Sequence, residues 1–376
     1  MGVDAWGFDK GRQALAKRLR TRRNILSLVR ASAFFSFLVI LVSGGSAALD
    51  AWLSSGLRPG WIQTAAFLVV VFAIGSAIGF PFAYLSAYRW EVESGLSRRT
   101  FGSWLRDQAK ASALGLAATV LAGEVILWLL DHVPSWWWLA AWSLGVVAGF
   151  ALAMLAPLFL VPLFFRSRPV ADPAVRSRLE ALARSAGLPV LGAFELGASA
   201  KTRRSNAGVM GFGRMRRIVV TDTLLQEYSA DEIDAVLAHE LGHQKFRDPW
   251  TGFAWSAGFS LFLSWAVGTL FAATHEAFGV MDLARPASLP IVALYASLGS
   301  ALGGPFDLWR SRKRERRADH FALELTRNPK AFESAIVKLH DKNLGVAAPR
   351  AWEVWLHYGH PTGRERVESA RSVRFG

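Results

Sequence analysis

Two histidines four residues apart, with a glutamate between them, are the residues in this chain most clearly arranged for chemistry. They lie in the segment His239-Glu240-Leu241-Gly242-His243. On a helix, positions i and i+4 share one face, so both imidazoles can reach a single tetrahedral zinc ion. Glu240 lies beside them, where a carboxylate can take a proton from metal-bound water. The pattern predicts a hydrolytic zinc site, although the same residues also occur in this spacing on solvated helices without a metal.

A catalytic zinc ion needs a third protein ligand and an open coordination position. Glu315, in the segment Arg314-Glu315-Arg316-Arg317-Ala318-Asp319, is the best candidate for that ligand. Asp319 follows one helical turn later on the same face. Its carboxylate could therefore hydrogen-bond the distal nitrogen of a ligating histidine and fix the tautomer. The spacing alone is equally compatible with two carboxylates that pair with neighbouring arginines on a wet helix.

The segments around His239 predict the elements that hold these side chains. Ser229 and Glu232 have capping-box spacing, and an apolar stripe runs from there through Leu241 to a stop before Pro249. Upstream, residues 190–196 and 216–221 resemble strands and flank a Gly-rich stretch, residues 198–213. This arrangement predicts a hairpin or a small sheet beside the zinc helix.

Half of the residues are hydrophobic, at 52%, and six apolar runs are long enough to cross a hydrocarbon layer about 30 Å thick. They lie at residues 32–50, 62–85, 111–130, 137–164, 251–273 and 288–309. We therefore expect a mainly α-helical, polytopic membrane protein with about six spans. Residues 1–165 would form an N-terminal membrane domain with four spans. Residues 166–376 would form a zincin-like catalytic domain with a small β-sheet, two further spans and a C-terminal helical segment.

The net charge of +14 is distributed unevenly among the connections between these spans. Arginine and lysine cluster before the first span, between the second and third, after the fourth and after the sixth. The other three connections hold one arginine, none and one arginine. By the positive-inside rule, both termini and the catalytic site are then cytoplasmic. A nucleic-acid-binding protein would instead need its basic residues on one folded face, so no nucleic-acid partner is expected.

The chain contains no cysteine, so any transition metal must be held by histidine and carboxylate ligands. One carboxylate, Glu124, lies inside the third apolar run. A glutamate is costly at that depth, and the sequence leaves two interpretations open. Glu124 either lines a wet cavity, or it snorkels or stays protonated.

The motifs together resemble the type I CAAX prenyl endopeptidases, a family of integral-membrane zinc metalloproteases. In that family the third ligand lies in a Glu-x-x-Ala-Asp-x-x-Ala context, which Glu315, Ala318, Asp319 and Ala322 reproduce. Residues 205–207 resemble the family's strand beside the active site, and residues 217–225 resemble the segment that leads into the zinc helix. His360-Pro361 followed by Arg366 resembles its C-terminal pattern.

The resemblance implies a role for each matching position. His239, His243 and Glu315 would bind one Zn²⁺ ion and Glu240 would act in catalysis, with Asp319 behind the ligands. His360 would stabilise the oxyanion, and Arg366 would brace the site. Asn206 and Ala207 would offer backbone hydrogen bonds to an extended peptide, as in strand addition. Without the resemblance, a turn at His360-Pro361 and a loop or cap at residues 205–206 would be the favoured interpretations.

Two questions stay open at the level of sequence. The eukaryotic branch of the family has seven spans, five before the zinc helix, whereas four precede it here. The substrate could be a prenylated C-terminal peptide or, if the source is bacterial and the location its plasma membrane, a damaged membrane protein. A transporter, a channel or an inactive scaffold with a structural metal site is the alternative to a protease. Membrane lipid is an expected partner in every case.

Overall fold

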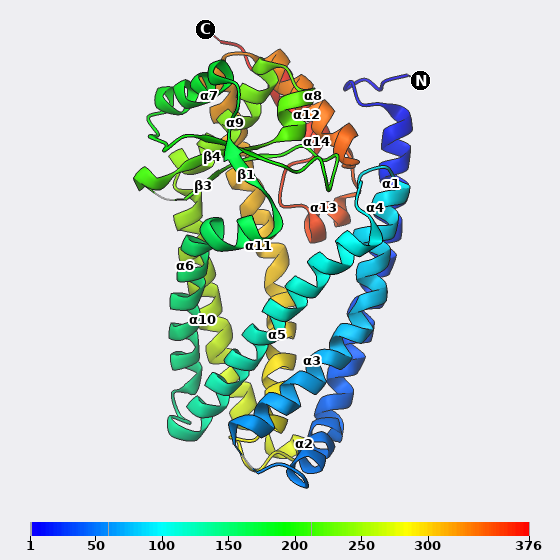
Figure 1. Cartoon of the computed structure of the whole chain (residues 1–376), viewed down its shortest axis with the longest axis vertical. Coiled ribbons are helices and arrows are strands. Elements are labelled where there is room, and N and C mark those ends of the chain that lie inside the picture. Colours follow the sequence, from blue (N-terminus) through cyan, green and yellow to red (C-terminus); the bar gives the residue numbers. More distant parts are fainter. Residues whose placement is uncertain (1, 59, 212, 376) are drawn as a thin grey trace.

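The computed structural model describes residues 2–58, 60–211 and 213–375 and is mainly helical. Long helices form the lower part of the molecule in Figure 1, and a mixed α/β part lies above them with both termini beside it. The helices are α1 (Lys10–Ile40), α2 (Ser46–Ser54), α3 (Trp61–Ala83), α4 (Trp90–Glu93), α5 (Phe101–His132), α6 (Trp137–Phe164), α7 (Pro173–Ser185), α8 (Asp222–Glu227), α9 (Ala230–Lys245), α10 (Asp248–Thr274), α11 (Leu289–Thr326), α12 (Pro329–Asn343), α13 (Ala351–His357) and α14 (Gly363–Ser372). The strands are β1 (Ser167–Pro169), β2 (Ala193–Leu196), β3 (Ala207–Met210) and β4 (Arg217–Thr221).

Within the described residues, six helical segments are long and apolar enough to cross a membrane. They are Lys10–Ser54, Trp61–Glu93, Phe101–His132, Trp137–Ala156, Asp248–Thr274 and Pro286–Thr326. Large apolar side chains on them point outward: Leu121, Val147 and Leu302 are 68, 67 and 76% exposed. Such surfaces are stable in hydrocarbon and costly in water. The predicted polytopic fold with about six spans is confirmed.

The sheet has the strand order β1-β2-β4-β3. β2 and β4 run parallel, whereas β3 pairs with β4 in the antiparallel sense. Ile218 and Val220 of β4 are fully buried against a core that includes Leu179 of α7 and Leu237 of α9. The prediction of a small sheet beside α9 is therefore correct. The alternative, a hairpin formed by β2 and β4, is not observed, because these two strands run parallel and β3, which lies between them in sequence, pairs at the edge of the sheet.

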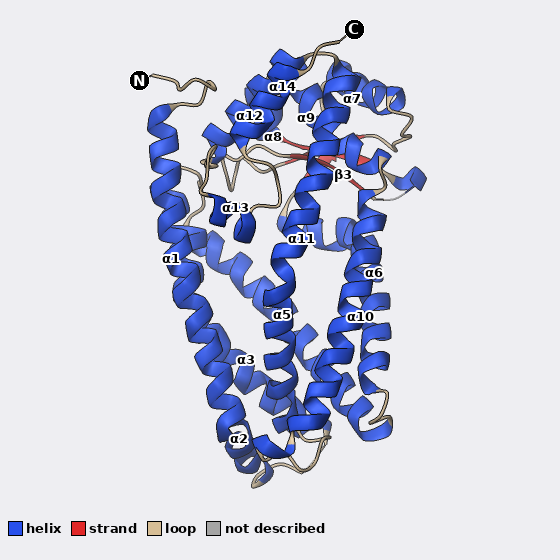
Figure 2. Ribbon diagram, turned by 180° about the vertical axis from the view of Figure 1, so that it is seen from behind, coloured by secondary structure: helices blue, strands red, loops and turns tan. Residues whose placement is uncertain are grey.

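α9 packs against α11, α12 and the edge strand β3, and α11 connects this part to the membrane. In Figure 2, α11 rises from among the long helices and ends beside α9. It is one uninterrupted helix of 38 residues, although Pro305 lies inside it. The helix that carries Glu315 is thus a continuation of the sixth span, which fixes the height of the site relative to the membrane.

Candidate active site

Local signals determine where α9 begins and ends. The Ser229 side chain accepts a hydrogen bond from the Glu232 N–H, and the Glu232 carboxylate accepts one from the Ser229 N–H, so the capping box is complete. At the other end, Arg247 takes a left-handed conformation with φ of 57°. The chain then starts α10 at Asp248, directly before Pro249. This reversal turns Asp248 back against His243.

Gly242 allows α11 to approach α9 closely. A Cβ atom at this position would lie 3.1 Å from the Ala318 Cα atom, which is closer than nearly all real contacts of this kind. Ala318 lies one turn after Glu315 and directly before Asp319 on the same helix. The missing side chain of Gly242 therefore brings both carboxylates within reach of the histidines.

We expect Gly242→Val to weaken metal binding roughly 10- to 100-fold while the protein stays folded, since the added atoms push α11 away from the histidines. Zinc content after equilibration with a competing chelator measures this effect. Gly258→Val is the matched control, because a Cβ atom at Gly258 meets nothing within 4 Å. Equal zinc retention in the two variants would contradict the packing argument.

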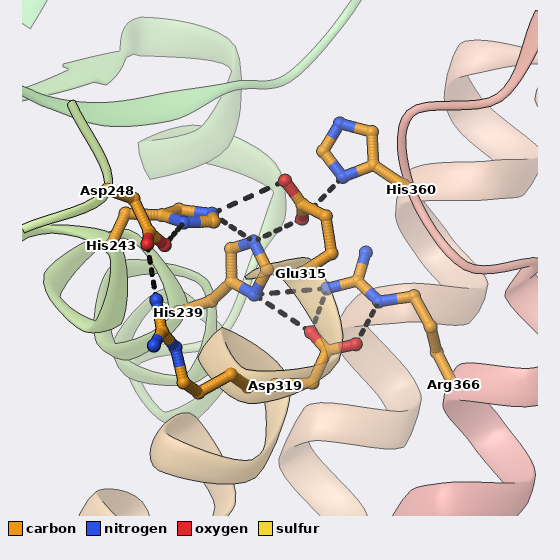
Figure 3. Close-up of polar contacts among 8 residues, drawn as sticks. His239, His243, Asp248, Glu315, Asp319, His360 and Arg366 are labelled. Carbon is orange, nitrogen blue, oxygen red and sulfur yellow. Dashed lines mark hydrogen bonds and ion pairs between the residues drawn. The ribbon is translucent and has the colours of Figure 1, made fainter. Parts of the chain in front are cut away.

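Side-chain atoms of three residues, two histidine nitrogens and the carboxylate oxygens of Glu315, converge where a metal would lie (Figure 3). The Nε2 atoms of His239 and His243 are 3.2 Å apart. Glu315 places Oε2 3.1 Å from His239 Nε2 and Oε1 3.5 Å from His243 Nε2. Ligand atoms about 2.0 Å from a tetrahedral zinc ion are separated by about 3.3 Å. The donor set therefore fits zinc in both chemistry and spacing.

The opposite nitrogen of each histidine is held by a carboxylate. His239 Nδ1 lies 2.8 Å from Asp319 Oδ1, and His243 Nδ1 lies 2.9 Å from Asp248 Oδ2. Arg366 in turn donates to both oxygens of Asp319, at 2.9 and 2.5 Å. These contacts make each Nδ1 a hydrogen-bond donor and leave each Nε2 free to bind a metal.

The same carboxylates make the site favourable for a positive charge. Burial disfavours a charged imidazole, but hydrogen bonds to Asp248 and Glu315 outweigh it and raise the pKa of His243 to about 10. For His239, burial is likewise outweighed by hydrogen bonds to Asp319 and Glu315, and the pKa is raised. A divalent cation can supply the positive charge that these acidic groups stabilise.

His360 reaches the site from the loop between α13 and α14. Its Nδ1 atom lies 2.6 Å from Glu315 Oε2, and His239, Glu315 and His360 have ligand atoms within 4.8 Å of one another. This trio is a second arrangement that could hold a metal. The side chain of His360 is 64% exposed, however, whereas those of His239 and Glu315 are 7 and 9% exposed. His360 thus borders the solvent side of the donor cluster.

A cavity of about 430 Å³ opens beside these residues. Its wall includes His239 and Glu240 of α9, His360 and Arg366 from the C-terminal part of the chain, and residues 204–206. Glu240 is half-buried and faces a space large enough for a peptide segment. We define this cavity as the active-site groove.

Residues 204–206, which line the groove, lead directly into the edge strand β3, where alternate residues turn their backbone groups toward the free edge. The N–H of Asn206 donates to Thr221 Oγ1 and its C=O accepts from the Thr221 N–H, both at 3.0 Å, so its backbone is used inside the sheet. Ala207 is next in the alternation and faces outward. Its N–H is held by Asn206 Oδ1 at 3.0 Å. Of the two residues expected to bond a peptide through the backbone, only Ala207 has its groups on the free edge.

Asn206, His239, Glu240, His360 and Arg366 line this groove, and His243, Glu315 and Asp319 contact His239. One residue of the site, Asp248, was not predicted from the sequence. Asp248 is 5% exposed and bonds His243, and Arg317 bonds Asp248 in turn. The available signal was an aspartate directly before a proline, five residues after His243. Asp248 reaches His243 only because the chain reverses at Arg247, and the residue pattern does not predict this reversal.

A family model described as peptidase family M48 matches residues 169–374, which is more than half of the chain. The chain belongs to peptidase family M48. A second model, the CAAX prenyl protease N-terminal region with five membrane helices, matches residues 12–166 of this M48 protein. These matches confirm the predicted resemblance, and the protein belongs to the class of membrane metalloproteases.

Individual relatives of the M48 chain agree with this assignment. It is 28% identical to the uncharacterized metalloprotease YhfN of Bacillus subtilis over 362 residues, 95% of this chain and 85% of YhfN. It is 30% identical to a CAAX prenyl protease 1 homolog of Oryza sativa over 318 residues, 82% of this chain and 73% of the homolog. The crystal structure of S. mikatae Ste24p shares the fold, with a TM-score of 0.85 at 23% identity over 95% of this chain and 88% of Ste24p.

The membrane half of this M48 protein differs from the five helices named in the N-terminal family model. Within the described residues, only four segments before α9 are long and apolar enough to span. Glu124 lies in the third of them, and its Oε1 atom is buried without a hydrogen-bond partner among the described residues. This oxygen of Glu124 therefore has neither a polar partner among the described residues nor contact with solvent.

Proposed function

We propose that the protein is a zinc metalloendopeptidase that cleaves peptide bonds of membrane-associated or prenylated substrates. The observation that carries the proposal is the convergence of His239, His243 and Glu315, with separations of 3.1 to 3.5 Å that match a tetrahedral zinc site. Zinc bound by these residues would polarise the scissile carbonyl and lower the pKa of its bound water.

The chain's own residues have separate roles in this proposal. Glu240 takes the proton of the attacking water and passes it to the leaving amine. His360 donates a hydrogen bond to the oxygen on which negative charge develops. Asp319 and Arg366 hold His239 in the tautomer that binds metal, and Asp248 does the same for His243. Ala207, with the Asn206 side chain beside it, pairs with an extended peptide at the free edge of β3.

The proposed orientation follows from the charges. Both termini lie at the end of the molecule that carries the sheet and α9 (Figure 1), and the basic connections flank the spans at that same end. We assign this end to the cytoplasm and the protein to a bacterial plasma membrane. In this arrangement residues 1–165 form the membrane domain and residues 166–376 form the protease domain. The basic loops contact membrane lipid and do not bind nucleic acid.

A structural metal site in a transporter, channel or inactive scaffold is the alternative, and it fits the donor set less well. Structural zinc sites are usually closed by four protein ligands. Here a fourth ligand would have to be His360, which is largely exposed and already bonds Glu315. A hydrolase instead needs one open coordination position, facing the groove, for water or substrate.

We expect zinc removal to abolish cleavage of a quenched peptide and zinc addition to restore it. The test uses detergent-purified protein, a peptide with a C-terminal Cys-aliphatic-aliphatic-X sequence, and the same peptide with a prenylated cysteine. Cleavage that follows zinc content supports the protease, and the ratio of the two rates shows whether the lipid matters. No cleavage of either peptide by zinc-loaded protein would overturn the proposed function.

A further inference from the structure

A second groove runs between α1 and α13, where the long helices meet the α/β part (Figures 1 and 2). Its volume is about 710 Å³, and among the described residues it shares no wall residue with the active-site groove. Residues 17–31 of α1 contribute one wall, and residues 346–357, which include α13, contribute the other. We call this cavity the α1–α13 groove. It has no part in the proposed chemistry.

The wall formed by α1 changes from polar to apolar along the helix. Its residues recur every three or four positions, so they form one face of α1. This face begins with Lys17, and its last part contains Ile25, Leu28 and Ala31. Arg30 is the last charged residue of α1, and a mainly apolar run follows it. The α1–α13 groove therefore crosses the level at which lipid headgroups give way to hydrocarbon.

The apolar part of the α1–α13 groove is open to its surroundings. On α1, Ile25 and Leu28 are 60 and 70% exposed, and on α13, Trp352 and Leu356 are 47 and 43% exposed. Exposed apolar side chains that lie together are costly in water, and exposed tryptophan is typical of a membrane–water interface. This part of the groove therefore favours an apolar occupant, and lipid acyl chains are available at that level.

The polar part of the α1–α13 groove carries more positive than negative charge. Glu353 is its acidic wall residue, and it is buried, accepts a hydrogen bond from Asn24 at 2.7 Å and lies 3.8 Å from Arg20. The charge of Glu353 is therefore balanced by Arg20. Lys17 and Arg350 also line the groove, are exposed, and form no ion pair with an acidic residue among the described residues. These two side chains are free to bind an anion.

We propose that the α1–α13 groove binds one anionic phospholipid, with its phosphate beside Lys17 and Arg350 and an acyl chain against Ile25 and Leu28. Such a lipid is charged at one end and apolar at the other, in the same order as the wall of α1. A free phosphate would leave the apolar part exposed to water. A zwitterionic lipid would bring its own positive charge toward Lys17 and Arg350, so a headgroup with net negative charge is favoured.

The test measures binding of two lipids, phosphatidylglycerol and phosphatidylcholine, each with the same fluorescent label at the end of an acyl chain. The full-length protein is delipidated and kept in an uncharged detergent. We expect phosphatidylglycerol to bind about 30-fold more tightly, as two basic residues beside a headgroup imply. Equal affinities would overturn the site. Displacement of the labelled lipid by glycerol 3-phosphate at equal concentration would also overturn it, because the groove would then bind a free phosphate.

A double variant, Lys17→Gln with Arg350→Gln, tests the polar part of the α1–α13 groove. The matched control is Arg18→Gln with Arg22→Gln, which removes two exposed positive charges of α1 that do not line the groove. We expect the first variant to lose most of the preference for phosphatidylglycerol and the control to keep it, both at wild-type zinc content. An equal loss in both variants would mean general attraction to a basic surface, and the groove would not be the site.

Leu28→Gln tests the apolar part of the same groove. We expect this variant to bind both labelled lipids about 10-fold more weakly and to keep the preference for phosphatidylglycerol, because it removes apolar contact and no charge. The double variant and Leu28→Gln should thus affect different quantities, the preference in one case and the overall affinity in the other. Wild-type affinity of Leu28→Gln for both lipids would show that no acyl chain lies against Leu28 and would overturn the proposal.

Discussion

Glu240→Gln is expected to lower the rate of peptide cleavage by about 10²- to 10⁴-fold while leaving zinc bound. The glutamine side chain keeps the size of the glutamate but cannot accept the proton of the attacking water. Glu240 lines the groove and contributes none of the donor atoms that converge between His239, His243 and Glu315. The metal site should therefore stay intact, and the measurement is single-turnover cleavage at equal zinc content.

Glu227→Gln is a suitable control for this variant. Glu227 lies on α8, is partly exposed and pairs with Lys342 at the surface, so its loss should change the rate little. A transporter or scaffold with a structural metal would show the same behaviour for both variants. Cleavage by Glu240→Gln at the wild-type rate, with zinc bound, would remove Glu240 from the chemistry.

The site residues that spacing alone predicted share one property: each pair lies within a single helix. His360, Arg366, Asn206 and Ala207 were predicted only from the family resemblance. His239 and His243 are one turn apart on α9, and Glu315 and Asp319 are one turn apart on α11, so the regular helix fixes each pair. The capped start of α9 was predictable for the same reason, since the Ser229 and Glu232 contacts are local.

The rest depends on contacts between distant segments, which a single sequence does not determine. Asp248 reaches His243 only because Arg247 reverses the chain, and Gly242 matters only because Ala318 packs on it. β2 and β4 pair in parallel, and β3, which lies between them in sequence, pairs with the other side of β4 at the sheet edge. α1 reaches α13 through the hydrogen bond from Asn24 to Glu353, although the two residues are far apart in sequence.

Glu315→Gln is expected to reduce zinc binding by more than the roughly 10- to 100-fold that follows loss of an outer hydrogen bond. The substitution removes the only negative charge among the three ligands we assign and replaces it with a neutral amide in a buried site. Glu315 is 7% exposed, so water can compensate little. Zinc content after equilibration with a competing chelator measures the loss. Glu324→Gln, an exposed position on the same helix, should retain zinc.

His360→Ala separates the two arrangements that could hold the metal. If His239, His243 and Glu315 are the ligands, His360→Ala keeps its zinc and loses about 10²- to 10³-fold in rate, as removal of one oxyanion donor does. If His360 is a ligand in place of His243, His360→Ala loses zinc and His243→Ala keeps it. We expect the first result, because His243 is fixed at its opposite nitrogen by Asp248, whereas His360 is 64% exposed and lies on a loop. Zinc retained by His243→Ala would contradict the ligand set.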